Sequence, residues 1–123
     1  MASYWRLRPG APKPGTIVGP LAEVPEGYAR EYRFGRGLSA FRMIVARHRG
    51  LVHAYLNLCP HMSLPLNDFA DTHITADGQL LVCTRHFAQF DMQTGVCVAG
   101  ACLGSELDRI AIHVDEDHNI KIG

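Results

Sequence analysis

Apolar and polar residues alternate in short runs along most of the chain, and glycine, proline and aspartate separate the runs. A period of two predicts β-strands, because successive side chains of a strand point to opposite faces of a sheet. No capping residue leads into a sustained 3.6-residue apolar pattern, so no helix is predicted. The expected strands are residues 4–8, 16–18, 28–34, 38–46, 51–56, 73–75, 79–82, 89–92, 96–98, 109–114 and 119–122.

Glycine marks three of the expected turns between these strands. Arg49-Gly50, Asp77-Gly78 and Thr94-Gly95 each place a glycine where a hairpin needs a positive φ, which costs glycine little. Residues 115–118 are expected to close a last hairpin. Many short strands joined by tight turns favour a sandwich or barrel of antiparallel sheets, so the predicted fold class is all-β.

Composition restricts the function classes. The 123 residues are expected to form one domain, residues 1–123, and their formal net charge of zero lacks the basic footprint of a nucleic-acid-binding protein. The first residues show neither an apolar signal region nor a twin-arginine pair, and no stretch approaches the roughly 20 apolar residues of a membrane span. We therefore expect a soluble, cytoplasmic protein without a membrane anchor. The oligomeric state stays open.

Two cysteine-histidine pairs carry the most evident chemistry. Cys59-Pro60-His61 and Cys83-Thr84-Arg85-His86 together offer two thiolates and two imidazoles to a metal centre. Buried core residues, a structural zinc site and a disulfide between the two cysteines are the alternatives. The C-x-H spacing is tighter than that of a zinc knuckle, and nothing indicates the oxidising compartment that a disulfide needs. The joint arrangement favours a metal cluster held at hairpin tips.

With the segment that follows, these pairs resemble the Rieske iron-sulfur family. The run HFAQFDMQTG at residues 86–95 is similar to the family's H-G-x-x-F-x-x-x-T-G, and the resemblance extends over about residues 41–107. It implies one [2Fe-2S] cluster per chain, within a cluster-binding region of about residues 57–104. One iron would be held by Cys59 and Cys83, and the other by His61 and His86. The implied fold has three stacked antiparallel sheets, with the cluster at a tip between two ligand loops.

Two residues near the implied ligands indicate a low reduction potential. Respiratory members of the family place serine and tyrosine hydroxyls near the sulfurs, and Ala88 and Phe90 stand at those positions here. Those members also have a disulfide between the ligand loops, whose cysteines would align near Leu64 and Arg85. Both features are missing, so we expect a potential of about −150 mV, the low end of the Rieske range.

Other residues are expected around the cluster. Phe87 replaces a glycine of the family pattern and is either a hydrophobic cap close to the cluster or a core aromatic residue. Gly100 and Ala101 lie in a segment similar to the family's covering loop, without its proline. Met62 and Arg85 adjoin the two histidine ligands, and Met62 belongs to apolar residues that either surround the exposed imidazoles or pack the loop.

The remaining cysteines and histidines are not expected to bind the cluster. Cys97 and Cys102 are expected to be buried thiols, with a redox-sensitive disulfide between them as the alternative. Surface positions, or positions where hydrogen bonds satisfy the ring, are expected for the other five histidines: His48, His53, His73, His113 and His118.

The resemblance implies a stand-alone Rieske ferredoxin, a one-electron carrier between a reductase and an oxygenase or other oxidoreductase. Such a protein catalyses no bond chemistry itself, and its expected partners are redox proteins. Two alternatives stay open. The chain would be a small Rieske subunit of a nitrite-reductase-type or oxygenase complex, or a redox sensor that changes partner binding without turnover.

Overall fold

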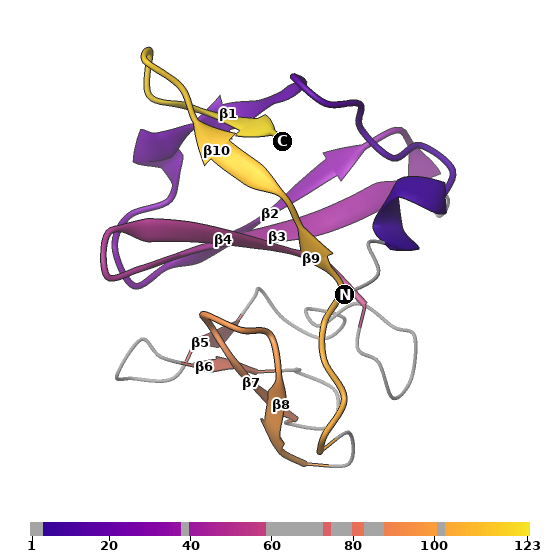
Figure 1. The fold of residues 1–123 in the computed structure, drawn as a ribbon, viewed down its shortest axis with the longest axis vertical. Coiled ribbons are helices and arrows are strands. Elements are labelled where there is room, and N and C mark those ends of the chain that lie inside the picture. The colour runs from indigo at the N-terminus through magenta and orange to yellow at the C-terminus, as the bar shows by residue number, and fades with distance from the viewer. Residues whose placement is uncertain (1–3, 38–39, 59–72, 75–79, 83–87, 101–102) are drawn as a thin grey trace.

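The computed structural model describes residues 4–37, 40–58, 73–74, 80–82, 88–100 and 103–123. Within these ranges eleven strands form three antiparallel sheets, which confirms the predicted all-β class and the three-sheet architecture. The sheets follow one another as layers in Figure 1. No helix in the described ranges is long and apolar enough to cross a membrane.

Sheets A and B join strands from distant parts of the chain, whereas sheet C consists of four consecutive strands. Sheet A has the order β1 (Ile17–Pro20), β11 (Asn119–Ile122) and β10 (Ile112–Val114). Sheet B, the middle layer, has the order β2 (Ala29–Phe34), β3 (Phe41–His48), β4 (Leu51–Leu56) and β9 (Arg109–Ile110). Sheet C has the order β5 (His73–Ile74), β6 (Leu80–Val82), β7 (Gln89–Asp91) and β8 (Cys97–Ala99).

Two predicted strands differ from the structure. Residues 4–8 were expected to be extended, but Tyr4–Leu7 forms the 3₁₀-helix η1, because Trp5 is fully buried and its ring lies 6.1 Å from that of Phe41. Residues 109–114 form two strands rather than one, since β9 pairs with β4 in sheet B whereas β10 pairs with β11 in sheet A. A second 3₁₀-helix, η2, spans Leu21–Glu23.

The glycine-based turn predictions are confirmed where the structure describes them. Arg49 and Gly50 both have positive φ, at 53° and 76°, and join β3 to β4 in a tight hairpin. Gly95 has a φ of 79°, and a Cβ there would lie 2.6 Å from Cε1 of Tyr55. Residues 115–118 close the β10–β11 hairpin through the N–H of His118, which donates to the carbonyl of Asp115. The Asp77-Gly78 turn lies outside the described residues.

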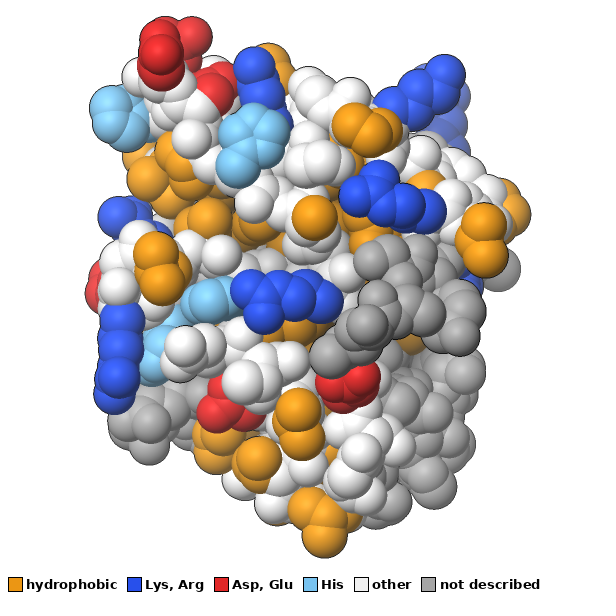
Figure 2. Space-filling model, viewed as in Figure 1, with side chains coloured by type: hydrophobic (Ala, Val, Ile, Leu, Met, Phe, Trp, Pro, Cys, Tyr) orange, Lys and Arg blue, Asp and Glu red, His pale blue; other side chains and the backbone are white. Residues whose placement is uncertain are grey.

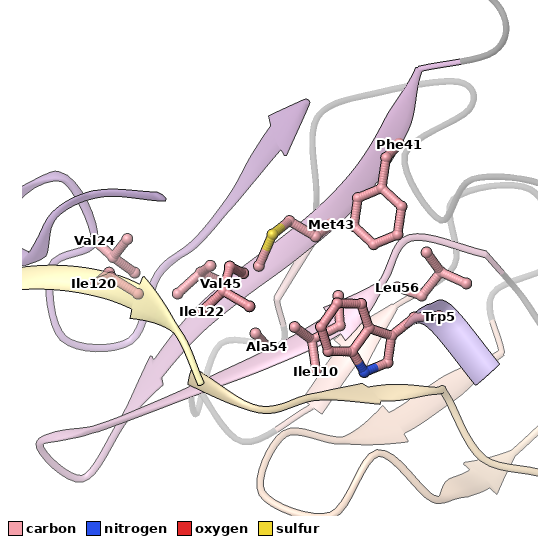
Figure 3. Packing of buried hydrophobic residues seen from close by; sticks show 10 residues of the cluster. All are labelled: Trp5, Val24, Phe41, Met43, Val45, Ala54, Leu56, Ile110, Ile120 and Ile122. Carbon is pink, nitrogen blue, oxygen red and sulfur yellow. The ribbon is translucent and has the colours of Figure 1, made fainter. Parts of the chain in front are cut away.

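Sheet B packs against both other sheets because its strands are apolar on both faces. One core joins sheets A and B with η1 (Figure 3); its buried members are Trp5, Val24, Phe41, Met43, Val45, Ala54, Leu56, Ile110, Ile120 and Ile122. The other core joins sheets B and C, and consists of Ile44, Ala46, Tyr55, Leu81, Ala88, Phe90, Met92, Cys97 and Leu107. Fully burying one large apolar side chain stabilises a fold by about 1.5–3 kcal/mol.

Some apolar side chains stay at the surface of sheet C. Val96, Val98 and Leu103 are exposed, and Figure 2 shows hydrophobic side chains gathered over the β8 part of that face. Leu103 lies close to Gly100 in space, because its N–H donates to the Gly100 carbonyl over 3.2 Å. The exposed apolar surface therefore adjoins the segment in which the covering loop was predicted.

Candidate metal centre

The segment with the second cysteine-histidine pair connects two paired strands. Val82, the last residue of β6, is directly before Cys83, and β7 begins at Gln89. Val82 and Gln89 face each other in the antiparallel ladder. The chain that carries Cys83 and His86 therefore leaves and re-enters sheet C at the same end, as predicted for a hairpin that presents ligands.

The segment with the first pair begins where β4 leaves sheet B. The N–H of Leu56 donates to the Asp108 carbonyl, and the N–H of Asn57 donates to the Arg42 carbonyl, each over 2.9 Å. Leu58 then turns back, since its N–H donates to the Leu56 carbonyl over 2.9 Å. Backbone hydrogen bonds therefore hold Leu56 and Asn57 to neighbouring segments just before the first pair begins.

Three of the predicted neighbours of the cluster are described. Ala88 and Phe90 are buried in the core between sheets B and C. Gly100 has a φ of 101°, and a Cβ at this position would lie 2.8 Å from Cα of Ala88. The structure therefore brings Ala88 and Gly100 into close contact, and only glycine allows this approach without a backbone shift.

The predicted ligands themselves lie outside the described residues. These are Cys59, His61, Cys83 and His86, and the same holds for Met62, Arg85, Phe87 and Ala101. In the described ranges no group of three or more histidine, cysteine, aspartate or glutamate side chains could hold a metal ion. The ligand set stays a prediction. Of the other two cysteines, Cys97 is buried as expected and its thiol donates to the Ala99 carbonyl, whereas Cys102 lies outside the described residues.

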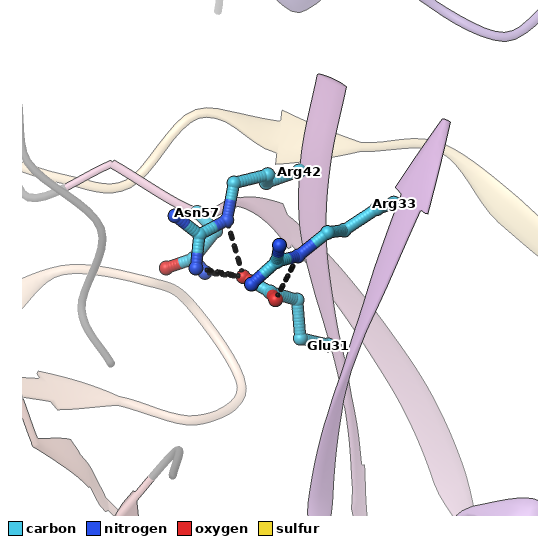
Figure 4. A network of polar contacts seen from close by, with 4 residues as sticks. All are labelled: Glu31, Arg33, Arg42 and Asn57. Atoms are coloured by element: carbon cyan, nitrogen blue, oxygen red, sulfur yellow. Dashed lines mark hydrogen bonds and ion pairs between the residues drawn. The ribbon is translucent and has the colours of Figure 1, made fainter. Parts of the chain in front are cut away.

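A polar network that the sequence did not indicate lies beside the first ligand segment (Figure 4). Glu31 on β2 accepts hydrogen bonds from Nε of Arg33 and Nε of Arg42, both over 2.7 Å, and from Nδ2 of Asn57. Burial raises the pKa of Glu31, but the hydrogen bonds from Arg42 and Arg33 outweigh it, so the pKa lies below its usual value. Glu31 is therefore a carboxylate at neutral pH.

His53 on β4 was expected to be exposed or fully hydrogen-bonded, and this expectation is wrong. The residue is 5% exposed, and its Nε2 has no hydrogen-bond partner among the described residues. The other ring nitrogen, Nδ1, lies 3.5 Å from Nη2 of Arg109. Burial, followed by the positive charge of Arg109, lowers the pKa of His53, so the buried ring is neutral at pH 7.

Two cysteine-histidine pairs that follow β-strands in the sequence of an all-β chain are typical of an iron-sulfur protein. The chain matches the Rieske [2Fe-2S] domain over residues 16–114 and belongs to the Rieske family. One [2Fe-2S] cluster per chain is therefore its cofactor.

A curated relative matches part of the chain. The ferredoxin component of an alkene monooxygenase system from Xanthobacter autotrophicus is 37% identical over 65 residues. The matched residues are 51% of this chain and 50% of that protein, so the match spans about half of the relative's length.

Solved structures show the same fold. The ferredoxin of carbazole 1,9a-dioxygenase from Nocardioides aromaticivorans IC177 has a TM-score of 0.71 at 22% identity, over 90% of this chain and 98% of that chain. A ferredoxin from Sphingomonas yanoikuyae B1 has a TM-score of 0.68 at 20% identity, over 88% and 96% of the two chains. At these identities the likeness concerns the fold.

The residues present fit such a cluster. Two thiolates and two imidazoles form the donor set of a Rieske centre, and they lie in segments that leave β4 and β6. The contact between Gly100 and Ala88 draws the segment after β8 against the segment before β7. Both the donor chemistry and the described surroundings are therefore compatible with the family's cofactor.

Proposed function

We propose that the chain is a one-electron carrier that passes electrons from a reductase to an oxygenase. The observation that carries this proposal is the extent of the Rieske domain, which accounts for residues 16–114 of 123. The curated relative is named as the ferredoxin component of a monooxygenase system, and one solved neighbour is a complex of a reduced oxygenase with an oxidised ferredoxin. The proposed carrier catalyses no bond chemistry itself.

In this proposal Cys59 and Cys83 hold one iron of the cluster, and His61 and His86 hold the other. When bound, the group supplies reversible one-electron transfer at a potential above that of all-cysteine ferredoxins, because neutral imidazoles replace two thiolate charges. In the sequence the first ligand pair follows β4 and the second follows β6. The proposed cluster-binding region remains residues 57–104 within a single domain of residues 1–123.

The proposed potential is low within the Rieske range, at about −150 mV. Ala88 and Phe90 are buried and carry no hydroxyl group that could donate to a sulfur. A donor near a cluster sulfur favours the reduced, more negative state, so its absence lowers the potential. A midpoint well above 0 mV would contradict this reasoning.

The proposed partners are redox proteins that dock briefly. The exposed Val98 and Leu103 supply apolar surface next to Gly100, which suits the small interfaces of electron-transfer encounters. We expect neither nucleic acid nor membrane among the partners, and we expect the protein in the cytoplasm. Fractionation of the native cells tests the compartment.

Two cysteine variants test the function. Cys83→Ser should abolish the visible absorption and the EPR signal of the reduced cluster, because it removes a ligand. Cys97→Ser is the matched control and should keep both, since Cys97 is buried in the core and its hydroxyl replacement can still donate to Ala99. Wild-type protein should also accept one electron per chain from a reductase and deliver it to an oxygenase. Colourless protein without inorganic sulfide would overturn the proposal.

A further inference from the structure

We infer that Glu31 is a positioning residue for the first ligand segment. Its carboxylate holds Asn57, two residues before Cys59, and so fixes the point at which the chain leaves sheet B. The inference rests on the proposed function, because it assigns Cys59 to the cluster. In this inference Glu31 acts through Asn57, whose side-chain amide donates to its carboxylate.

Asn57 is the described residue through which sheet B reaches the ligand segment. It is fully buried, its backbone N–H donates to the Arg42 carbonyl over 2.9 Å, and its side-chain amide donates to Oε2 of Glu31. Because consecutive Cα atoms lie about 3.8 Å apart, Cα of Cys59 stays within about 7.6 Å of Cα of Asn57. A shift of Asn57 would therefore be passed directly to the ligand.

The carboxylate of Glu31 accepts hydrogen bonds from three donors, two of them positively charged, and a neutral side chain could not satisfy all three. Oε2 of Glu31 accepts from both Arg42 and Asn57, while Oε1 accepts from Arg33. The side chain of Glu31 is only 13% exposed and that of Arg42 is 26% exposed. Charge-assisted hydrogen bonds of this kind are roughly twice as strong as neutral ones, and they fix geometry. Glutamine could accept from one arginine but would turn its NH₂ group toward another donor.

The network connects the neighbouring strands β2, β3 and β4 at one end of these strands in the middle sheet. Glu31 comes from β2 and Arg42 from β3, and Asn57 directly follows β4; the ladder register pairs Glu31 with Ile44 and Met43 with Leu56. Figure 4 shows the four side chains converging at the end of these strands where Asn57 leaves β4. A network that only stabilised the sheet would not need the buried Asn57, because Arg33 and Arg42 already neutralise the carboxylate.

Glu31→Gln tests the inference, with Glu26→Gln as the matched control. Glu26 binds the same β3–β4 hairpin at its opposite end, where its carboxylate accepts the N–H groups of Arg49 and Gly50. We expect the cluster of the loaded Glu31→Gln protein to be lost to an iron chelator about tenfold faster than in wild type. Its EPR g values should also shift. Both properties should be unchanged in Glu26→Gln.

A reciprocal exchange separates positioning from general stability. In the double variant Glu31→Gln with Asn57→Asp, the carboxylate and the amide change places, so the pair is restored and the lifetime of the cluster should recover. If Glu31→Gln does not fold, as judged by circular dichroism, Asn57→Ser takes its place, because it removes the amide that donates to Glu31 and keeps the arginine pairs.

Equal cluster lifetimes and g values in Glu31→Gln and Glu26→Gln would overturn the inference while the proposed function stood. Failure of the reciprocal exchange to restore the lifetime would overturn it as well. Wild-type protein that binds no cluster would instead overturn the proposed function, and the inference with it. The two failures are therefore distinguishable in one set of measurements.

Discussion

The face of sheet B that packs on sheet C has polar groups at both ends, and the two ends differ in how completely they are satisfied. At the ligand end, Glu31 accepts hydrogen bonds from two arginines and Asn57. At the opposite end, His53 is buried beside Arg109, and no residue in the described ranges pairs with its Nε2. Buried polar groups stabilise a fold only when they are paired. Hydrogen bonds therefore satisfy the buried polar groups around Glu31 and Asn57 more completely than they satisfy His53.

The strongest test of this comparison removes Arg42. Arg42→Met should lower the free energy of unfolding by about 2–3 kcal/mol, because it leaves the mostly buried carboxylate with the exposed Arg33 as its remaining cationic partner, beside the neutral amide of Asn57. Urea denaturation followed by circular dichroism measures this loss. A loss below about 0.5 kcal/mol, typical of surface pairs, would mean that the ligand end is no tighter than ordinary surface.

The opposite end should respond in the other direction. His53→Leu should raise the free energy of unfolding at pH 7 by about 1 kcal/mol, because it replaces an unsatisfied buried nitrogen with an apolar group. The gain should increase at lower pH. Folding lowers the pKa of His53, so its contribution to stability is complete above pH 6.5 and is lost as the pH falls below that value.

The contributions of His53 and Glu31 to stability change in different pH ranges, and this difference provides a check on the comparison. Folding also lowers the pKa of Glu31, so its contribution is kept above pH 4.5 and is lost only as the pH falls further. Between pH 7 and pH 5, His53→Leu should therefore have a flatter stability profile than wild type, whereas Glu31→Gln should retain the wild-type slope. Parallel profiles for wild type and His53→Leu would refute the role assigned to His53.

The smallest expected effect concerns the outer arginine of the network. The side chain of Arg33 is 58% exposed, so its pair with Glu31 is screened by water. Arg33→Met should cost about 0.5 kcal/mol or less, and added salt should reduce the difference from wild type further. A cost equal to that of Arg42→Met would show that exposure does not rank the two arginines.

Local sequence patterns identified most strands and turns, because both depend on neighbouring residues. Residues 51–56 and 119–122 were predicted with the bounds that the structure has for β4 and β11. The hairpin at Gly50 followed from its dipeptide alone. Division of residues 109–114 between two sheets could not be read locally, because it depends on which distant strand each half pairs with.

The candidate site was predicted unevenly for the same reason. The ligand pairs have a spacing that can be read from the sequence, and as ligands they stay a prediction because they lie outside the described residues. Glu31 and Asn57 are 26 residues apart and meet only through the register of β2, β3 and β4. The sequence does not distinguish the buried His53 from an exposed histidine of a strand, because its burial depends on how the sheets pack. Polar contacts between distant strands are therefore what sequence reasoning missed.

The register of the middle sheet has a consequence for insertions and deletions. Strands β2, β3 and β4 pair in unbroken register, with apolar residues on both faces of β3. One residue added within β3 would turn the side chains on one side of the insertion to the opposite face of the sheet. Arg42 could then point into the core between sheets A and B, which contains Trp5. Within these three strands, length changes should therefore be confined to the Arg49–Gly50 hairpin, at the end of the sheet opposite Asn57.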